Sequence, residues 1–335
     1  MRRELLRISI PLREPFMTAS SAITERELLL LVLEEDGLRG YGEAAPFEPY
    51  DGVSIDAVAH ALLDGSRADG PPQAAAAEEM ARLDLDARRE GRPVAPPGAD
   101  LLPVNATIPA LPPGEAAERA REAVRRGYSC VKLKAGLPDD VERVAAVRAA
   151  IGPWPALRLD ANGAWGAAEA IERIGVLSEH ELELVEQPCA TLEELAAVRA
   201  GVSVPVAADE PILSAADVAR AARLEACDVV CVKLAPSGGY GAAQAILDAA
   251  AAHGLGAIVS STLDGPWGIA ASLQLAAAAD VRLPCGLATL ELFDGPLARA
   301  LPAPRGGVLA VPQGPGFGVE IEPEALDAAV VERLV

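Results

Sequence analysis

The chain lacks an excess of positive charge. It has 29 lysine and arginine residues against 49 aspartate and glutamate residues, and its formal net charge is -20 at pH 7. Sequence-independent binding of nucleic acid needs a dense basic surface, and an anionic membrane attracts basic segments in the same way. We therefore expect neither a nucleic acid nor a membrane as a partner. A small anionic substrate remains compatible, because a metal ion and a few lysines can make one pocket positive.

The chain also lacks the hydrophobic segments that export or anchor a protein. Residues 1–7 contain no long apolar run before a small-residue cleavage site, and no later stretch is apolar enough to span a bilayer. This predicts a cytoplasmic protein. The five cysteines have no CxxC spacing, which favours reduced structural thiols over disulfides or a thiolate metal site; they are Cys130, Cys189, Cys227, Cys231 and Cys285.

Motifs for two common enzyme classes are missing. No P-loop, GxGxxG or GxSxG stands in a suitable strand–helix context, so nucleotide binding and serine hydrolysis have no support. The three histidines, His60, His180 and His253, lie in or beside predicted helices and indicate surface or capping positions. Neither a histidine base nor a zinc triad is therefore expected.

The first hundred residues predict a small α+β domain. Strands are expected at 4–12 and 27–34, and Asp36-Gly37 is a strong hairpin signal before 38–42. Two stretches with apolar residues on a helical period follow, at 54–64 and 73–89. The Pro-rich segment 93–103 then separates this domain from a different pattern.

After this joint, short apolar strands alternate with Ala-rich helices, the βα repeat of a parallel sheet. The expected strands are 128–134, 156–160, 182–186, 206–209, 229–234, 256–260 and 286–292, and the expected helices include 139–150, 167–177, 191–200, 215–224 and 241–253. Their even spacing fits a closed barrel, for which the chain is long enough. We expect a capping domain at 1–103, a barrel at 104–301, and a tail at 302–335 whose strand 308–311 returns to the capping domain.

Two lysines stand two residues apart in the strand Val131-Lys132-Leu133-Lys134. Residues at this spacing point to the same side of a strand, so both ammonium groups face one way and Leu133 faces the other. In a confined barrel interior, their repulsion and desolvation would lower at least one lysine pKa and create a base. An edge strand with solvated lysines is the alternative, and this motif alone does not exclude it.

Three carboxylates close consecutive predicted strands, where barrel enzymes place their chemistry. They are Asp160, Glu186 and Asp209. Converging carboxylate oxygens suit Mg2+, and also Mn2+, and leave positions open for substrate oxygens. Lys233, in the apolar strand 229–234, would stand opposite the lysine pair, although it could instead reach solvent at the strand's end.

The motifs KLK, LDANGAW, VEQP, ADE and VKLAPSGG, in this order, resemble the muconate-lactonising subgroup of the enolase superfamily. The resemblance implies a TIM-like (β/α)7β barrel with an N-terminal α+β capping domain. It also implies that Asp160, Glu186 and Asp209 bind Mg2+ and that Asn162 orients the metal-ligand loop. Lys134 would be the acid/base, Lys132 would lower its pKa, and Lys233 would be a second acid/base or a cation that steadies the enolate.

Within the subgroup, segments 104–110, 186–191, 259–264 and 285–289 are most similar to the o-succinylbenzoate synthases of menaquinone biosynthesis. This implies a lyase that removes water from a small cyclohexadiene carboxylate, with Ser260, Ser261 and Thr262 beside the substrate. Loops 16–23 and 47–52 would close over the barrel mouth and set specificity. A homo-oligomer is left open.

Dipeptide epimerases and N-succinylamino acid racemases of the same subgroup, which are isomerases, use the same pair of bases and are the main alternative. The epimerases usually carry Asp-x-Asp near the eighth strand, where this chain has Leu292-Phe293-Asp294, so elimination is favoured. A non-catalytic barrel that binds a small acid would have lost at least one catalytic position. The non-catalytic alternative is disfavoured because all six positions are present: Lys132, Lys134, Asp160, Glu186, Asp209 and Lys233.

Overall fold

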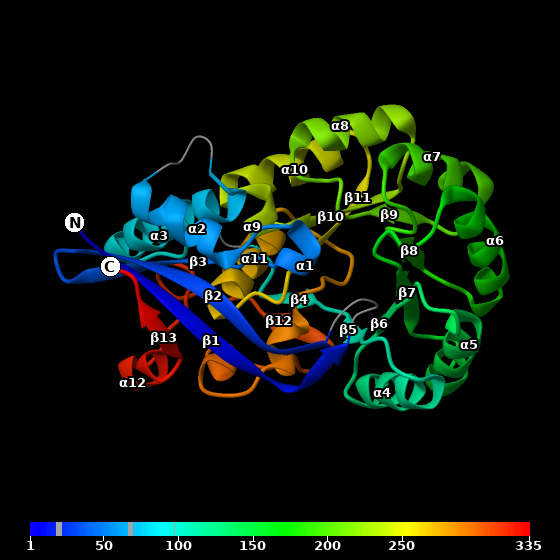
Figure 1. Ribbon diagram of the computed structural model, residues 1–335, viewed down its shortest axis with the longest axis horizontal. Coiled ribbons are helices and arrows are strands. Elements are labelled where there is room, and N and C mark those ends of the chain that lie inside the picture. The colour runs from blue at the N-terminus through cyan, green and yellow to red at the C-terminus, as the bar shows by residue number, and fades with distance from the viewer. Residues whose placement is uncertain (18–21, 66–69, 97) are drawn as a thin grey trace.

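The computed structural model describes residues 1–17, 22–65, 70–96 and 98–335. Its N-terminal part contains a four-stranded antiparallel sheet in the order β13-β1-β2-β3 (Figure 1). These strands are β1 (Arg2–Met17), β2 (Ala22–Glu35), β3 (Leu38–Ala44) and β13 (Val330–Arg333). The predicted hairpin is confirmed: Asp36 and Gly37 have φ angles of 54° and 80°, as a type I′ turn requires.

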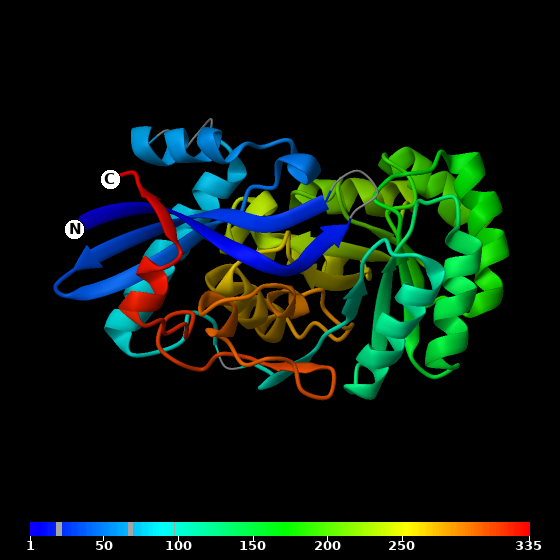
Figure 2. The same ribbon diagram turned by 60° about the horizontal axis from the view of Figure 1, so that its bottom comes forward.

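Successive side chains of strand β2 point to opposite faces of the sheet, and both faces are buried. Leu29, Leu31 and Leu33 pack with helices α2 (Ile55–Asp64) and α3 (Pro72–Glu90), whereas Leu28 and Leu30 belong to the core shared with the barrel. Both helices were predicted within two residues of their observed ends. The sheet therefore joins its own helices to the rest of the molecule (Figure 2).

The second part is a curled parallel sheet of seven strands in the order β5 to β11, with helices outside it. The strands are β5 (Ala106–Ile108), β6 (Cys130–Lys134), β7 (Ala156–Asp160), β8 (Leu184–Glu186), β9 (Val206–Ala208), β10 (Val229–Lys233) and β11 (Gly256–Ser260). The helices are α4 (Pro113–Arg125), α5 (Asp140–Ile151), α6 (Ala167–Leu177), α7 (Leu192–Gly201), α8 (Ala215–Leu224), α9 (Leu234–Ser237), α10 (Tyr240–Ala252) and α11 (Pro266–Ala278).

A very short segment closes this sheet into a TIM-like barrel. Gly286 forms a parallel bridge with Ser260 at the end of β11, and Cys285 forms one with Val104, just before β5. The expected strand 286–292 was wrong, because residues Ala288–Leu292 form a 3-10 helix. An apolar run of this length does not distinguish a strand from a buried helical turn. The (β/α)7β fold with its α+β capping domain is nevertheless confirmed.

The C-terminal tail differs in detail from the expectation. Strand β12 (Val308–Ala310) pairs with β4 (Leu101–Pro103) in the Pro-rich joint, and it is the later strand β13 that pairs with β1. Helix α12 (Pro323–Asp327) lies between β12 and β13. The boundaries at 103 and 301 stay a prediction. All five cysteines are buried and free, and no helix in the described ranges is long and apolar enough to cross a membrane.

Candidate active site

A cavity of about 420 Å³ opens at the carboxyl ends of the barrel strands. Nine of the ten predicted site residues line it: Lys132, Lys134, Asp160, Asn162, Asp209, Lys233, Ser260, Ser261 and Thr262. The capping domain contributes Phe16, Phe47, Pro49 and Tyr50, the last two from helix α1 (Glu48–Asp51). Glu186 does not line the cavity; its carboxylate accepts a hydrogen bond from Lys132, which does.

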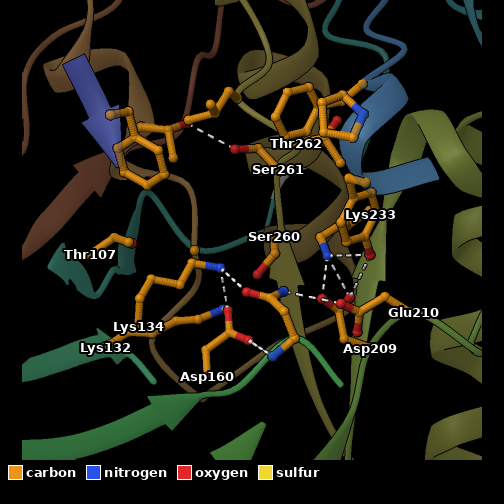
Figure 3. Close-up of a pocket in the computed structure, with 18 of the residues that line it drawn as sticks. Thr107, Lys132, Lys134, Asp160, Asp209, Glu210, Lys233, Ser260, Ser261 and Thr262 are labelled. Atoms are coloured by element: carbon orange, nitrogen blue, oxygen red, sulfur yellow. Dashed lines mark hydrogen bonds and ion pairs between the residues drawn. The ribbon is translucent and has the colours of Figure 1, made fainter. Parts of the chain in front are cut away.

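The two lysines of β6 share one carboxylate oxygen. Nζ of Lys132 lies 2.9 Å and Nζ of Lys134 lies 2.7 Å from Oδ2 of Asp160. Lys132 also reaches Glu186 at 2.7 Å, whereas Leu133 between the lysines is fully buried in the core outside the cavity. The alternation of a β-strand thus puts both ammonium groups on the cavity side, where Figure 3 shows them beside Asp160.

Lys233 lies across the cavity from this pair, at the end of β10 (Figure 3). Its Nζ donates hydrogen bonds to Oδ1 of Asp209 at 2.5 Å and to the hydroxyl of Tyr50 at 2.6 Å. It also lies 4.2 Å from the centre of the Tyr50 ring. Tyr50 in turn donates to Asp209 at 3.3 Å. Lys233, Asp209 and Tyr50 therefore form one cluster on this side.

Asn162 connects the two sides of the site. Its Oδ1 accepts from Lys134 at 2.7 Å, and its Nδ2 donates to Glu210 at 3.0 Å. Asn162 adopts a positive φ of 46°, a left-handed conformation that asparagine tolerates better than most residues. Burial and the neighbouring charge of Asp209 raise the pKa of Glu210 to about 7. The hydrogen bond that Asn162 donates stabilises the ionised form of Glu210 and therefore lowers the pKa of Glu210.

The pKa of Lys132 is raised, so the lowered pKa that we expect for at least one lysine of the pair does not fall on Lys132. Burial by itself would lower it, but the carboxylates of Asp160 and Glu186 together outweigh burial and raise the pKa of Lys132. For Lys233 the same balance holds: burial opposes the charge, and Asp209 raises its pKa well above the ordinary value. At Lys132 and Lys233, opposite charges at hydrogen-bond distance thus outweigh burial.

The carboxylates suit a hard divalent cation. Asp160, Glu186 and Asp209 are at most 3% exposed, and buried carboxylates need a cation close by, a need that lysines meet here. Oxygen atoms of Glu186 and Asp209 also converge with Sγ of Cys231 within 4.8 Å. Burial, followed by these two carboxylates, raises the pKa of Cys231 well above 9, so without a bound cation it is a thiol beside two carboxylates. Such oxygen ligands favour Mg2+.

Sequence reasoning missed several residues of the cavity. Thr107, Glu210 and Thr289 line it without having been given a role there, although Glu210 follows Asp209 directly in the chain. Leu292, which the sequence analysis used against the epimerases, lines it as well. Tyr50 falls within the loop 47–52 that we expected over the barrel mouth, but its contact with Lys233 has no local sequence signal. In the other expected loop, 16–23, Phe16 lines the cavity, and residues 18–21 lie outside the described part of the chain.

Comparison with known proteins identifies the family. Residues 115–325 match the family described as enolase C-terminal domain-like. The o-succinylbenzoate synthase of Thermobifida fusca is 40% identical over 313 residues, which span 90% of this chain and 86% of that protein. The o-succinylbenzoate synthase of Mycolicibacterium smegmatis is 39% identical, with 91% and 84% covered.

Solved structures agree with this fold. A dipeptide epimerase from Enterococcus faecalis, solved with Mg and L-Leu-L-Tyr, is 26% identical with a TM-score of 0.86, over 95% of this chain and 99% of that one. The N-succinyl Arg/Lys racemase from Bacillus cereus has a TM-score of 0.93 over 99% and 98% of the two chains; at 23% identity it supports the fold alone. The family match and the relatives show that this chain is an enzyme of the enolase superfamily, in the family that includes the o-succinylbenzoate synthases.

Proposed function

We propose that this enzyme is a Mg2+-dependent o-succinylbenzoate synthase. It would dehydrate 2-succinyl-6-hydroxy-2,4-cyclohexadiene-1-carboxylate, a step of menaquinone biosynthesis. The observation that carries the proposal is the 37–40% identity to o-succinylbenzoate synthases over about nine tenths of the chain. The three lysines and the buried carboxylates around one cavity support it, since this chemistry needs both a base and a cation.

Lys134 is the proposed base. Its ammonium group lines the cavity beside Asp160 and Asn162, which would orient Nζ toward the substrate. In its neutral form, Nζ would take the proton from the carbon next to the substrate carboxylate. The same nitrogen would return that proton to the departing hydroxide, so that one water leaves and Lys134 regains its starting state. Proton removal and delivery on one face make this a syn elimination.

Asp160, Glu186 and Asp209 are the proposed ligands of Mg2+. The bound ion would hold the substrate carboxylate and stabilise the negative charge that develops when the neighbouring proton is removed. Lys132 would keep the buried carboxylates Asp160 and Glu186 ionised through its hydrogen bonds to both. Ser260, Ser261 and Thr262, at and after the end of β11, line the cavity and would lie beside the substrate.

An N-succinylamino acid racemase or dipeptide epimerase is the second candidate. Its favouring observation is Lys233, a second amine across the cavity from Lys134, as a two-base proton transfer requires. Leu292 weighs against the epimerase, because it puts an apolar side chain in the cavity wall where an ammonium-bearing substrate would need an anion. Asp294 pairs instead with Arg299 at 3.6 Å and does not line the cavity.

The test is an assay of the purified protein with Mg2+ in D2O. The cyclohexadiene carboxylate is offered beside a panel of dipeptides and N-succinylamino acids, and products are followed by absorbance and mass spectrometry. Dehydration of the cyclohexadiene carboxylate that disappears in Lys134→Ala supports the synthase. Deuterium exchange into dipeptides alone, with no dehydration, would replace it by the epimerase.

A further inference from the structure

The two proposed bases are held by different parts of the molecule. The side-chain partners of Lys134 are Asp160 and Asn162, and both belong to the barrel. The partners of Lys233 are Asp209, from the barrel, and Tyr50, from the capping domain. One base is thus positioned within the barrel, whereas the other depends on a contact between residues 183 positions apart in the chain.

Several hydrogen bonds fix the turn that carries Tyr50. The backbone N–H groups of Tyr50 and Asp51 donate to the carbonyl of Phe47, and Gly52 ends the turn with a left-handed φ of 70°. The Asp51 carboxylate accepts from the Phe47 N–H at 3.0 Å and from Gln73 on α3 at 2.8 Å. Because Gln73 is fully buried, the position of Tyr50 is tied to the main helix of the capping domain.

We propose that Tyr50 is a positioning residue for Lys233. Its hydroxyl accepts a hydrogen bond from the ammonium and its ring packs against it, so the seating of the turn 47–52 orients Lys233 but not Lys134. The inference rests on the proposed function, whose substrate would lie in the cavity that Lys233 lines across from Lys134. When Asp209 serves as a metal ligand, Tyr50 is the remaining side-chain hydrogen-bond partner of Lys233 within the described residues.

An unusual feature of the composition makes this inference testable without substrate. Lys132, Lys134 and Lys233 are the only lysines of the chain, while its other basic side chains are 26 arginines, from 29 minus 3. Protein labelled with 13C at the lysine Cε therefore gives NMR signals from the active site alone. The signal of Lys233 is assigned by its loss in Lys233→Arg, and Mg2+ is present throughout.

In Tyr50→Phe, which keeps the ring and removes the hydroxyl, we expect the Lys233 signal to shift by more than its linewidth. The signals of Lys132 and Lys134 should stay within theirs. Tyr128→Phe is the matched control: it removes a hydroxyl that donates to Glu291 at 2.6 Å outside this cavity, and it should move none of the three. An unmoved Lys233 signal, or equal movement of all three, would overturn the inference.

A second measurement compares the rates of α-proton exchange on the two faces of the substrate. N-succinylamino acids of both configurations are incubated with enzyme and Mg2+ in D2O, and exchange of each α-proton is measured by mass spectrometry. Tyr50→Phe should slow exchange on the Lys233 face about tenfold more than on the Lys134 face. Equal slowing of both would contradict the inference. If the wild type neither dehydrates nor exchanges any substrate, the proposed function fails, and the lysine spectra still decide the role of Tyr50.

Discussion

A buried carboxyl group at the contact between the two domains predicts a pH-dependent stability. Glu43, at the end of β3, is 2% exposed and accepts hydrogen bonds from the backbone N–H groups of Gly265, at 2.7 Å, and Gly268, at 3.3 Å, at the start of α11. Burial, and then the charge of Asp264, raise its pKa from 4.5 to about 8; the two N–H donors and Arg26 act in the opposite direction. The raised pKa predicts that Glu43 keeps its proton in the folded protein at pH values where the unfolded chain has released it.

The size of the effect follows from the two pKa values. Between 4.5 and about 8, the folded state binds one more proton at Glu43 than the unfolded state, so the free energy of unfolding falls as pH rises. Glu43 makes its full contribution to the free energy of unfolding below pH 4.5. At about 1.4 kcal/mol for each pKa unit, this contribution falls by about 5 kcal/mol between pH 4.5 and pH 8. It is constant outside this window.

Glu43→Gln tests this because glutamine has the same shape and does not titrate. Its amide group accepts from only one of the two N–H donors, which costs about 1 kcal/mol. The variant should therefore be about 1 kcal/mol less stable than the wild type at pH 4, equally stable near pH 5, and about 4 kcal/mol more stable at pH 8.

The assay is reversible urea unfolding of both proteins, followed by circular dichroism from pH 4 to pH 8. Glu118→Gln is the control: Glu118 forms exposed ion pairs with Arg121 and Arg125, so its stability difference should stay within about 1 kcal/mol at every pH. If the difference between Glu43→Gln and the wild type is also flat across this range, the proton assigned to Glu43 is refuted.

Three further predictions concern the active site. Lys134→Ala should lower the rate of dehydration by about 10² to 10⁴-fold, and an unchanged rate in a continuous absorbance assay would exclude Lys134 as the base. Glu186→Gln should weaken Mg2+ binding at least about tenfold by isothermal titration calorimetry, since it removes the charge of one of the three proposed carboxylate ligands; equal affinity would remove Glu186 from the proposed metal site. Leu292→Asp should allow deuterium exchange into dipeptides, because it places an anion where the dipeptide ammonium group would bind. If the variant shows no such exchange, Leu292 is not what excludes dipeptide substrates.

Much of the fold follows from local patterns in the sequence. Helices α6 (Ala167–Leu177) and α8 (Ala215–Leu224) have the predicted ends, because alanine-rich amphipathic stretches between strand patterns are unambiguous. The eighth strand was predicted wrongly, because its pairing is limited to Cys285 and Gly286 and the following apolar residues turn into a 3-10 helix. Where an element depends on closing the barrel, local preference does not fix its length.

The sequence by itself determined which residues reach the end of each barrel strand. Lys132, Lys134, Asp160, Asp209 and Lys233 all line one cavity, as strand alternation and strand order predict. It did not determine what surrounds them. Distances between elements far apart in the chain decide the raised pKa of Lys132, the raised pKa of Glu43 and the place of Cys231 beside the carboxylates.

The contact between Tyr50 and Lys233 shows this division most clearly. Periodicity places Lys233 at a strand end, and hydrophobic and turn patterns place Tyr50 in a loop, but neither contains the distance between them. That distance is set when the sheet of the capping domain packs its second apolar face, with Leu28 and Leu30, into the core shared with the barrel. Residue types and their order were therefore readable from the sequence. The electrostatic surroundings of the lysine pair and of Lys233 arise only in the tertiary structure, where side chains from distant parts of the chain meet.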